Sequence, residues 1–365
     1  MDDFVESSTS KVSVVMPAYN VADFIGEMLD SLMAQTLSDI EVICVDDGST
    51  DSTALIIKDY TIRDSRIKLI SKENGGAATA RNIGLELATG ESVIFVDADD
   101  MLLPTMLEEL YSALKQGDAD ISVCETQKLN HKDGTVVPRF NFPYSLEQRT
   151  YFANEVDDNL FQIFRSSPTN KLFDSLFLAK NNINFQNLKN NNDVFFVCAN
   201  LALASKIAVV KKPLYIYRTG YGNSTQDTKW KYPLCQIDAA EALFDYLNNK
   251  EISSALRKSL LNRCWELCLK GLELAIWYHN DEDEAYNRAC ILTKKWNLDQ
   301  LCFKDFMKKS QAFRYWCLKH SNKENFMWAY AFKVPNLRGP RPLKYKISLF
   351  TRLLISVMRS TVKVG

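Results

Sequence analysis

The chain has 365 residues, and its 46% hydrophobic and 24% charged content is ordinary for a soluble globular protein. The 44 Lys and Arg residues nearly balance the 45 Asp and Glu residues, so we expect no nucleic-acid partner. The sequence shows neither a secretory signal nor a run of about 18 apolar residues, which predicts no transmembrane helix. Its nine cysteines form no C-x-x-C pair, and we interpret them as reduced thiols of a cytoplasmic protein.

The first 125 residues alternate short β-rich runs with helical patterns. Strands are expected at Val12–Met16, Glu41–Asp46, Ile67–Ser71, Ser92–Val96 and Ile121–Cys124. Helices are expected at Val21–Ala34, Ser52–Tyr60, Gly76–Ala88 and Pro104–Gln116. This alternation predicts a doubly wound, mostly parallel α/β sheet, a Rossmann-like nucleotide-binding half. Ligands of such sheets bind beyond the carboxyl ends of the strands.

The rest of the chain carries weaker patterns. Residues 126–150 are polar with an expected turn at 132–134, and two short strands are expected at Lys206–Val210 and Leu214–Tyr217. Helices follow at about 233–249, 253–279 and 282–296. We interpret the tryptophans of this region as packing residues, with stacking on an acceptor sugar as the alternative: Trp265, Trp277, Trp296, Trp316 and Trp328.

Polar groups follow four consecutive predicted strands. These segments are Pro17-Ala18-Tyr19-Asn20, Asp46-Asp47-Gly48-Ser49-Thr50-Asp51, Glu73-Asn74-Gly75-Gly76 running into Arg81, and Asp97-Ala98-Asp99-Asp100. Each has a structural alternative. Tyr19 can be a loop aromatic, Asp51 a helix cap, and Arg81 a solvated helix residue. Because the four segments converge on one edge of the sheet, we interpret them as a ligand site.

The acidic segment is harder to explain structurally. Asp97, Asp99 and Asp100 would repel one another beside an apolar strand, and a divalent cation would relieve that repulsion. Carboxylate oxygens suit hard ions, so the sequence predicts Mn²⁺ or Mg²⁺ at this loop. The alternative is a solvated acidic segment before a helix that starts near Pro104.

Together these motifs resemble the family 2 glycosyltransferases of bacterial surface-polysaccharide type, which have a GT-A fold. The close resemblance covers Lys11 to about Glu125, through VSVVMPAYN, VDDGSTDST, NGGAATARNIG and IFVDADD. It resumes weakly at Asn170-Lys171-Leu172-Phe173, at Asn192-Asp193-Val194-Phe195-Phe196 and at Tyr215-Ile216-Tyr217-Arg218.

The resemblance implies a role for each matching residue. Tyr19, with Pro17 and Ala18, would line the base pocket, and Asp47 would accept the N3–H of uracil or thymine. Arg81 would lie near the base or diphosphate, Asp97 would contact the ribose or metal, and Asp99 would bind the metal. Asp193 would be the general base, although Asn192 stands where the family has Glu. Other nucleotide-sugar contacts are expected at Asn20, Asn74 and Ala98.

The expected activity is an inverting, metal-dependent transfer from a UDP-sugar to a glycan or lipid-linked acceptor. A nicotinamide-dependent oxidoreductase would need G-x-G-x-x-G after the first strand, and a nucleotidyltransferase would need a Gly-rich basic phosphate loop. Neither motif is present. A non-catalytic nucleotide-sugar-binding protein with a decayed acceptor site stays open, as does an ordinary helix-capping role for Asp193.

The domains expected from these patterns are a disordered N-terminus at 1–10, a GT-A domain at 11–228, a helical domain at 229–335 and a basic tail at 336–365. The GT-A domain would comprise a donor half at 11–125 and an acceptor half at 126–228. From Arg338 onward the tail has seven Lys or Arg residues and no Asp or Glu. Its apolar and basic faces favour peripheral contact of 343–363 with the inner face of the cell membrane; the alternative is a helix docked on the protein itself.

Overall fold

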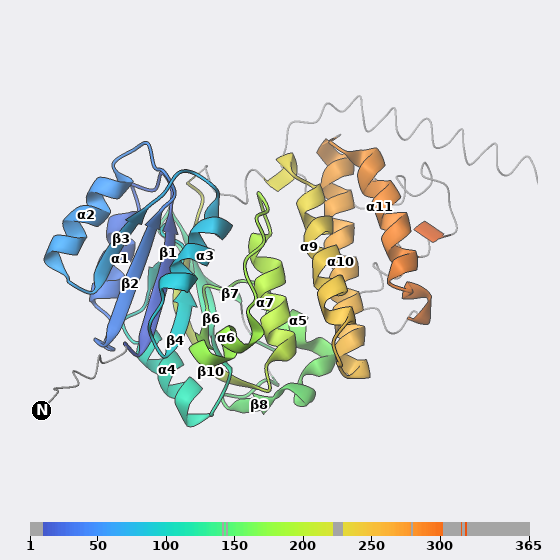
Figure 1. Cartoon of the computed structure of the whole chain (residues 1–365), viewed down its shortest axis with the longest axis horizontal. Helices are drawn as coiled ribbons and strands as arrows, with labels where there is room; N and C mark the ends of the chain where they lie inside the picture. The colour runs from blue at the N-terminus through green and yellow to red at the C-terminus, as the bar shows by residue number, and fades with distance from the viewer. Residues whose placement is uncertain are drawn as a thin grey trace, which may run out of the picture.

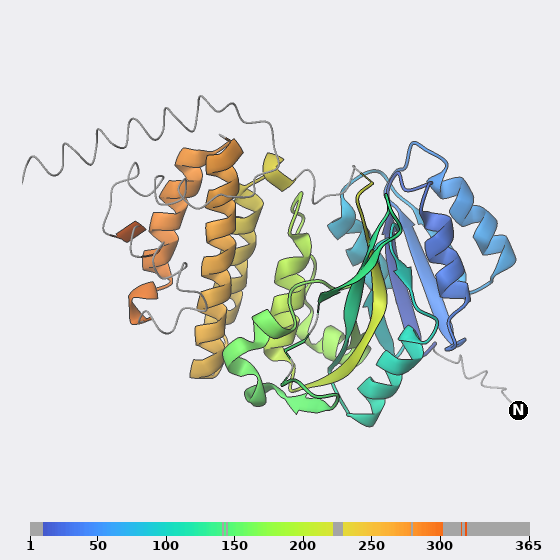
Figure 2. The same cartoon turned by 180° about the vertical axis from the view of Figure 1, so that it is seen from behind.

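The computed structural model describes residues 10–140, 142–143, 145–221, 229–278, 280–301, 315 and 318–319. Within these residues ten strands form one sheet with helices on both faces, and a group of long helices stands beside it (Figures 1 and 2). None of the described helices is long and apolar enough to cross a membrane. The expected tail at 336–365 and all of the expected disordered N-terminus except Ser10 lie outside the described residues.

The elements are bounded as follows. The strands are β1 (Val12–Ala18), β2 (Ile40–Asp46), β3 (Ile67–Ser71), β4 (Ser92–Phe95), β5 (Met101–Leu102), β6 (Ile121–Asn130), β7 (Val136–Phe140), β8 (Thr150–Phe152), β9 (Lys171–Asp174) and β10 (Lys206–Thr219). The α-helices are α1 (Ile25–Met33), α2 (Thr53–Arg63), α3 (Ala77–Leu87), α4 (Met106–Gln116), α5 (Leu160–Ile163), α6 (Ser175–Asn181), α7 (Asn192–Leu203), α9 (Leu234–Asn248), α10 (Ser254–Tyr278) and α11 (Glu282–Lys295). Short 3₁₀ helices are η1 (Ala153–Glu155), η2 (Asp157–Asn159), η3 (Lys229–Lys231) and η4 (Leu298–Gln300).

The order of strands across the sheet is β3-β2-β1-β4-β9-β6-β10-β5. The first four are parallel, which confirms the doubly wound arrangement predicted for the N-terminal half. β9 then runs antiparallel to both β4 and β6, and β10 runs parallel to β6. The carboxyl ends of β1, β2, β3 and β4 therefore share one edge of the sheet, as expected.

β1 is buried on both faces, which explains why its sequence is continuously apolar. Val14 and Met16 pack into the cluster that contains α1 and α4, whereas Val15 faces the cluster that contains Ala78 of α3. Helix α3 approaches the strand closely at Gly84, where an added Cβ would lie 2.3 Å from Val15 Cγ1. The glycine therefore lets the helix that carries Arg81 lie directly on β1.

The helical region shares its core with one face of the sheet. A single hydrophobic cluster runs from Val15 and Phe95 through α7 to α9, α10 and α11. Trp265 and Trp296 are fully buried within it, which confirms the packing interpretation for these two; Trp316 and Trp328 lie outside the described residues. The domain boundaries stay predictions, but α9, α10 and α11 pack against the same core as the sheet.

Two expected elements differ in extent. The strand expected at Ile121–Cys124 continues to Asn130 and pairs with β7, and the two strands expected at 206–217 are one strand with irregular pairing around Pro213. The polar sequence at 126–140 gave no sign of these strands. They are stabilised by hydrogen bonds to neighbouring strands, whereas the sequence pattern reveals only strands that bury an apolar face.

Glu41 of β2 anchors the amino ends of the parallel strands. Its carboxylate accepts hydrogen bonds from Ser13 Oγ at 2.6 Å, Lys68 Nζ at 2.7 Å, and the Thr89 backbone N–H and hydroxyl at 2.7 and 2.8 Å. Burial alone would raise the pKa of Glu41, but the hydrogen bonds from Lys68, Ser13 and Thr89 outweigh it and lower the pKa to about 2.

Glu41→Ala should lower the free energy of unfolding by about 2–3 kcal/mol at pH 7, because it leaves buried donors without an acceptor. The folded pKa of Glu41 lies below that of an unfolded Glu, about 4.3. This stabilisation is therefore present above pH about 4.3 and is lost as the pH falls toward 2. Urea unfolding at pH 7 and at about pH 3 should show a smaller difference between wild type and variant at the lower pH. An equal difference at both would contradict the pKa assignment.

Candidate functional site

The loops after β1 and β2 hold each other at the carboxyl edge of the sheet. Asn20, in the left-handed region with φ 50°, accepts a hydrogen bond from the Thr50 N–H at 2.8 Å and donates its own N–H to Ser49 Oγ at 3.1 Å. The Asp51 carboxylate accepts from the first backbone N–H of α2 at 2.9 Å, which supports the capping alternative for this residue. Tyr19, beyond the end of β1, is 48% exposed, so its ring faces outward at the expected nucleotide position.

Asp47 organises the third loop. Its carboxylate accepts from Lys72 Nζ at 2.5 Å and from the backbone N–H groups of Gly75 and Gly76 at 2.9 and 2.7 Å. Asn74 Nδ2 in turn donates to the Asp47 carbonyl at 3.0 Å. Asp47 is 2% exposed, so these contacts enclose its carboxylate almost completely. Asp47 and Asn74, both predicted nucleotide contacts, thus also shape the loop.

The three acidic residues after β4 have different environments. Asp97 is one-third exposed and lies 2.6 Å from Arg81 Nη2, whereas Asp100 is fully buried. Burial and the charge of Asp97 raise the pKa of Asp99. Burial and the charge of Asp99 raise the pKa of Asp100 well above its usual range. The site therefore concentrates more negative charge than its neighbours neutralise.

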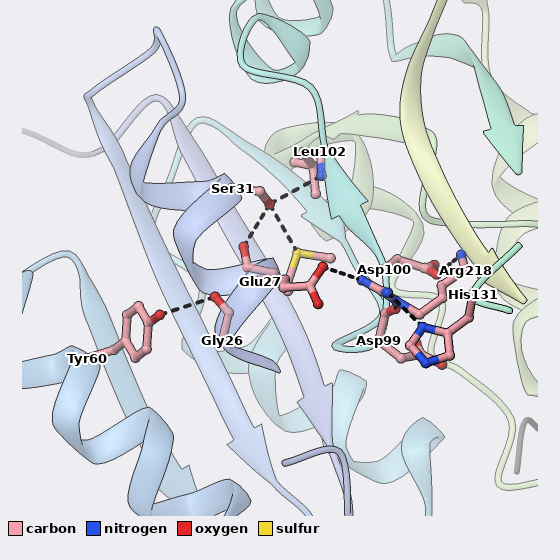
Figure 3. A network of polar contacts seen from close by, with 10 residues as sticks. Gly26, Glu27, Ser31, Tyr60, Asp99, Asp100, Leu102, His131 and Arg218 are labelled. Carbon is pink, nitrogen blue, oxygen red and sulfur yellow. Dashed lines mark hydrogen bonds and ion pairs between the residues drawn. The ribbon is translucent and has the colours of Figure 1, made fainter. Parts of the chain in front are cut away.

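Two residues of β10 support this acidic loop, and Figure 3 shows part of the network. Tyr215 donates its hydroxyl to Asp100 Oδ2 at 2.6 Å, and the Arg218 backbone N–H donates to Asp100 Oδ1 at 2.7 Å. The buried Arg218 guanidinium reaches the Asp99 carbonyl at 2.9 Å and Glu27 of α1 at 2.7 Å. The acidic loop is therefore held in place by hydrogen bonds to β10, and Arg218 of β10 is in turn paired with Glu27 of α1.

Asp99 presents its carboxylate differently from Asp100. One of its oxygens accepts a hydrogen bond from the Tyr221 hydroxyl. Among the described residues, no group of three or more His, Cys, Asp or Glu side chains is arranged to hold a metal ion. Any cation at this loop would therefore need ligands beyond the protein side chains that the structure describes.

Arg81 connects the acidic loop after β4 to the start of α7. It is 7% exposed, so it is not the solvated helix residue of the structural alternative. One nitrogen, Nη2, binds Asp97 at 2.6 Å and the other, Nη1, binds Asn192 Oδ1 at 2.9 Å. The guanidinium also lies over the ring of Phe185, with 5.5 Å to the centroid. The Asn192 side-chain oxygen therefore accepts the hydrogen bond from Arg81 that a Glu carboxylate at this position would accept.

Asp193 lies in the first turn of α7, beside this bridge. The residue that caps the helix is Asn191, so Asp193 is not its N-cap. Within the part of the chain that the structure describes, no other side chain forms a hydrogen bond or ion pair with the Asp193 carboxylate. Burial raises the pKa of Asp193, Arg81 opposes that rise, and Asp97 adds to it. The result is a carboxylate close to Asp97 with a raised proton affinity.

The sequence interpretation assigned no role to Tyr215, Arg218 or Tyr221. Tyr215 and Arg218 belong to a motif that resembles the family only weakly. The one signal in the sequence was the mixture of polar and apolar residues around them, which is typical of a strand with side chains on both faces. Their partners lie more than a hundred residues earlier, in the loop after β4. No local pattern could have paired them.

Comparison with known proteins shows which protein family the chain resembles. A family model described as "Glycosyl transferase family 2" matches residues 13–177, which include the four strand-end loops. Glycosyltransferase GlyG of Streptococcus pneumoniae is 29% identical over 299 residues, which cover 78% of this chain and 95% of that protein. Cholesterol galactosyltransferase of Borreliella burgdorferi is 30% identical over 326 residues, which cover 85% of this chain and 83% of that protein.

A solved structure shares the fold as well. The crystal structure of S. aureus TarS 1–349 in complex with UDP-GlcNAc matches with a TM-score of 0.70 and 23% sequence identity. The match covers 88% of this chain and 90% of that chain. The likeness therefore extends beyond the N-terminal half to the helices α9 and α10 that follow β10, and it confirms the GT-A fold.

Tyr215→Phe should lower the free energy of unfolding by about 1–3 kcal/mol, because it removes the hydroxyl that satisfies the buried Asp100 carboxylate. Tyr217→Phe on the same strand is the matched control, since no hydrogen bond of its hydroxyl is found among the described residues. Its effect should stay within about 0.5 kcal/mol. Urea unfolding of the two variants measures both values, and equal effects would argue against the supporting role of Tyr215.

Proposed function

Because the chain belongs to the family 2 glycosyltransferases, we propose that it moves a sugar from a UDP-sugar to a glycan or lipid-linked acceptor, with inversion at the anomeric carbon. The observation that carries the proposal is the placement of Asp193, a half-buried carboxylate with a raised pKa, beside the Arg81 bridge that joins α7 to the acidic loop. The setting that we propose is assembly of a bacterial surface polysaccharide; one relative is named poly(ribitol-phosphate) β-N-acetylglucosaminyltransferase TarS, of Staphylococcus aureus.

The donor would bind at the edge formed by the first three loops. Tyr19 offers an exposed ring for the base, and Asp97 is exposed enough to reach the ribose. Asp47, at the same edge, would accept a base N–H. TarS, which shares the fold, has been crystallised with UDP-GlcNAc and with UDP. We therefore favour a uridine diphosphate donor that carries a hexose or an N-acetylhexosamine.

Asp193 would act as the general base. Transfer with inversion needs a group on the far side of the sugar to take the proton of the acceptor hydroxyl. A carboxylate does this best when its pKa lies nearer to the working pH than that of an ordinary Asp, and burial shifts Asp193 in that direction. Arg81 would position the turn that carries Asp193 relative to Asp97.

Asp193→Asn should lower kcat by on the order of 10²-fold or more and leave the dissociation constant for UDP almost unchanged. Because burial raises the pKa of Asp193, the acid limb of the wild-type pH profile should lie above the usual Asp value, about 3.9. Initial-rate kinetics over pH and calorimetric UDP titration measure both quantities. A variant with near-normal kcat would move the base elsewhere.

The acidic loop fits a divalent cation. Asp97 and Asp99 lie in one loop, where burial and the charges of neighbouring aspartates raise the pKa of Asp99 and of Asp100. Mg²⁺ is commonly held by one or two carboxylates together with substrate phosphates, so the small number of protein ligands suits Mg²⁺ or Mn²⁺. Asp99 would hold the ion, while the Asp100 carboxylate is already engaged by Tyr215 and Arg218. When bound, such an ion neutralises charge on the leaving diphosphate.

Removing the cation or its ligand should therefore stop transfer. Excess EDTA should abolish activity, and Mn²⁺ or Mg²⁺ should restore it. Asp99→Asn should weaken UDP binding in the presence of Mn²⁺ but change it little in EDTA, because the affinity that is lost is the ion's contribution. Calorimetric titration of UDP with and without Mn²⁺ tests this, and undiminished turnover in EDTA would contradict it.

The alternative function is a nucleotide-sugar-binding protein without catalysis. The departure at Asn192 is the feature that favours it, yet Asn192 Oδ1 accepts the Arg81 hydrogen bond at 2.9 Å. The bridge beside Asp193 is therefore intact, and we favour an enzyme with a working acceptor site. UDP release from candidate donors, measured with and without acceptor, separates the two functions.

We also propose that residues 343–363, which lie outside the described residues, contact an anionic membrane surface and keep the enzyme near a lipid-linked acceptor. The support is the sequence of the tail, which has seven Lys or Arg residues and no Asp or Glu from Arg338 onward and apolar residues at helical spacing. This would place the protein at the inner face of the cell membrane.

Truncation before Arg338 should leave a folded protein that no longer co-sediments with anionic vesicles. Each basic residue contributes on the order of 1 kcal/mol near such a surface, and salt should weaken the attraction. Sedimentation with vesicles of phosphatidylglycerol at low and high salt tests this. If the truncated chain aggregates or melts early, the tail belongs to the core instead.

A further inference from the structure

An exposed pair of aromatic rings lies at the start of the helical region. Trp230 of η3 stacks on Tyr278, the last residue of α10, with 5.1 Å between ring centroids and an angle of 22° between planes. Trp230 is 37% exposed, Tyr278 is 40% exposed, and Tyr232 in the same segment is 44% exposed. We call Trp230, Tyr232 and Tyr278 the aromatic platform.

The platform is held in place by backbone contacts. Asn280, just beyond α10, donates its side-chain N–H to the Lys231 carbonyl at 2.9 Å, which fixes η3 against the end of α10. The Lys231 ammonium lies 5.8 Å from the centroid of the Trp230 ring. Two stacked rings that are pre-positioned and still partly exposed leave apolar area uncovered, which is a mark of binding surfaces.

The platform is also tied to the loop that carries the general base. The Tyr232 carbonyl accepts a hydrogen bond from Asn190 Nδ2 at 3.2 Å, and the chain then runs from Asn190 through Asn192 to Asp193. η3 lies beside the loop that leads into α7 in both views of the fold (Figures 1 and 2). The platform therefore borders the site on the Asp193 side.

This position matches the side from which an acceptor must arrive. The nucleotide would occupy the loops after β1, β2 and β3, whereas the general base must contact the acceptor hydroxyl. An acceptor glycan whose end lies at Asp193 extends away from the nucleotide, toward η3 and the end of α10. Sugars present flat C–H faces that pack on aromatic rings, and Trp and Tyr add a polar tip for hydroxyl groups.

We propose that the aromatic platform binds the acceptor carbohydrate, one or more residues before the sugar that receives the transferred unit. The proposal rests on the glycosyltransferase function proposed above, in which Asp193 faces the acceptor. The platform would add affinity for longer acceptors and leave donor binding untouched, because its contacts are with the loop before α7 and not with the donor loops.

The experiment compares Trp230→Ala, Tyr278→Ala and Trp230→Phe with the wild type. Phe152→Ala is the matched control, because Phe152 of β8 is equally an exposed aromatic, 59% exposed, but lies in a strand distant in sequence from η3 and α10. The probe is an array of defined oligosaccharides that end in glucose, galactose or N-acetylhexosamine, one to six sugars long. Binding is measured with the full chain, and UDP affinity and thermal unfolding are measured in parallel.

The wild type should bind a subset of oligosaccharides longer than one sugar. Trp230→Ala and Tyr278→Ala should weaken that binding by on the order of 10-fold, whereas Trp230→Phe and Phe152→Ala should stay close to the wild type. UDP affinity should be unchanged in all four. Two results would overturn the proposal: unaltered oligosaccharide binding by the two alanine variants at normal thermal stability, or no oligosaccharide binding by the wild type.

Asp193→Asn separates this proposal from the function on which it rests. It should keep the platform-dependent oligosaccharide binding while losing transfer. If the wild type releases no UDP from any donor in the presence of the bound oligosaccharides, the proposed transferase function fails while the platform still binds carbohydrate. If transfer occurs but Trp230→Ala leaves the KM for long acceptors unchanged, the platform proposal alone fails.

Discussion

The arrangement of the site depends on one buried charge. Asp100 is fully buried, and its carboxylate is satisfied by the Tyr215 hydroxyl and the Arg218 backbone N–H. A buried carboxylate without such partners would cost several kcal/mol, so β10 must lie where it does for the loop to be stable. With Asp100 fixed, Asp97 and Asp99 lie at the edge of the sheet, where Asp97 pairs with Arg81 and Asp99 accepts a hydrogen bond from the Tyr221 hydroxyl.

The second constraint joins the two halves of the site. Arg81 reaches Asp97 on one side and Asn192 on the other, and α3 can bring it there because Gly84 allows the helix to lie close to Val15. The bridge sets where α7 begins and so where Asp193 lies relative to the acidic loop. A donor held by the loops and an acceptor held near Asp193 would then face each other, which is the requirement for a single displacement with inversion.

The sequence predicted the parts of this protein that are locally determined. Apart from the short β5, the strands and helices up to residue 116, the loops that follow the strands, and the acidic segment all followed from periodicity and spacing. The long β10 did not, because Pro213 lies within it and its partners are β6 and β5. The same limit hid the double role of Asp47, whose carboxylate binds Gly75 and Gly76, and the support of Asp100 by β10. These contacts join residues that only the fold brings together.

The roles of Asp193 and Asp99 stay predictions, although the structure shows that Asp193 does not cap its helix.

The central claim is a single displacement between a donor at the acidic loop and an acceptor hydroxyl at Asp193. The most direct measurement is the anomeric configuration of the first product, followed by proton NMR during transfer from an α-linked UDP-sugar. The account predicts a β-linked product from the start of the reaction. An α-linked product would contradict it, because a single displacement at the anomeric carbon inverts the configuration of an α-linked donor.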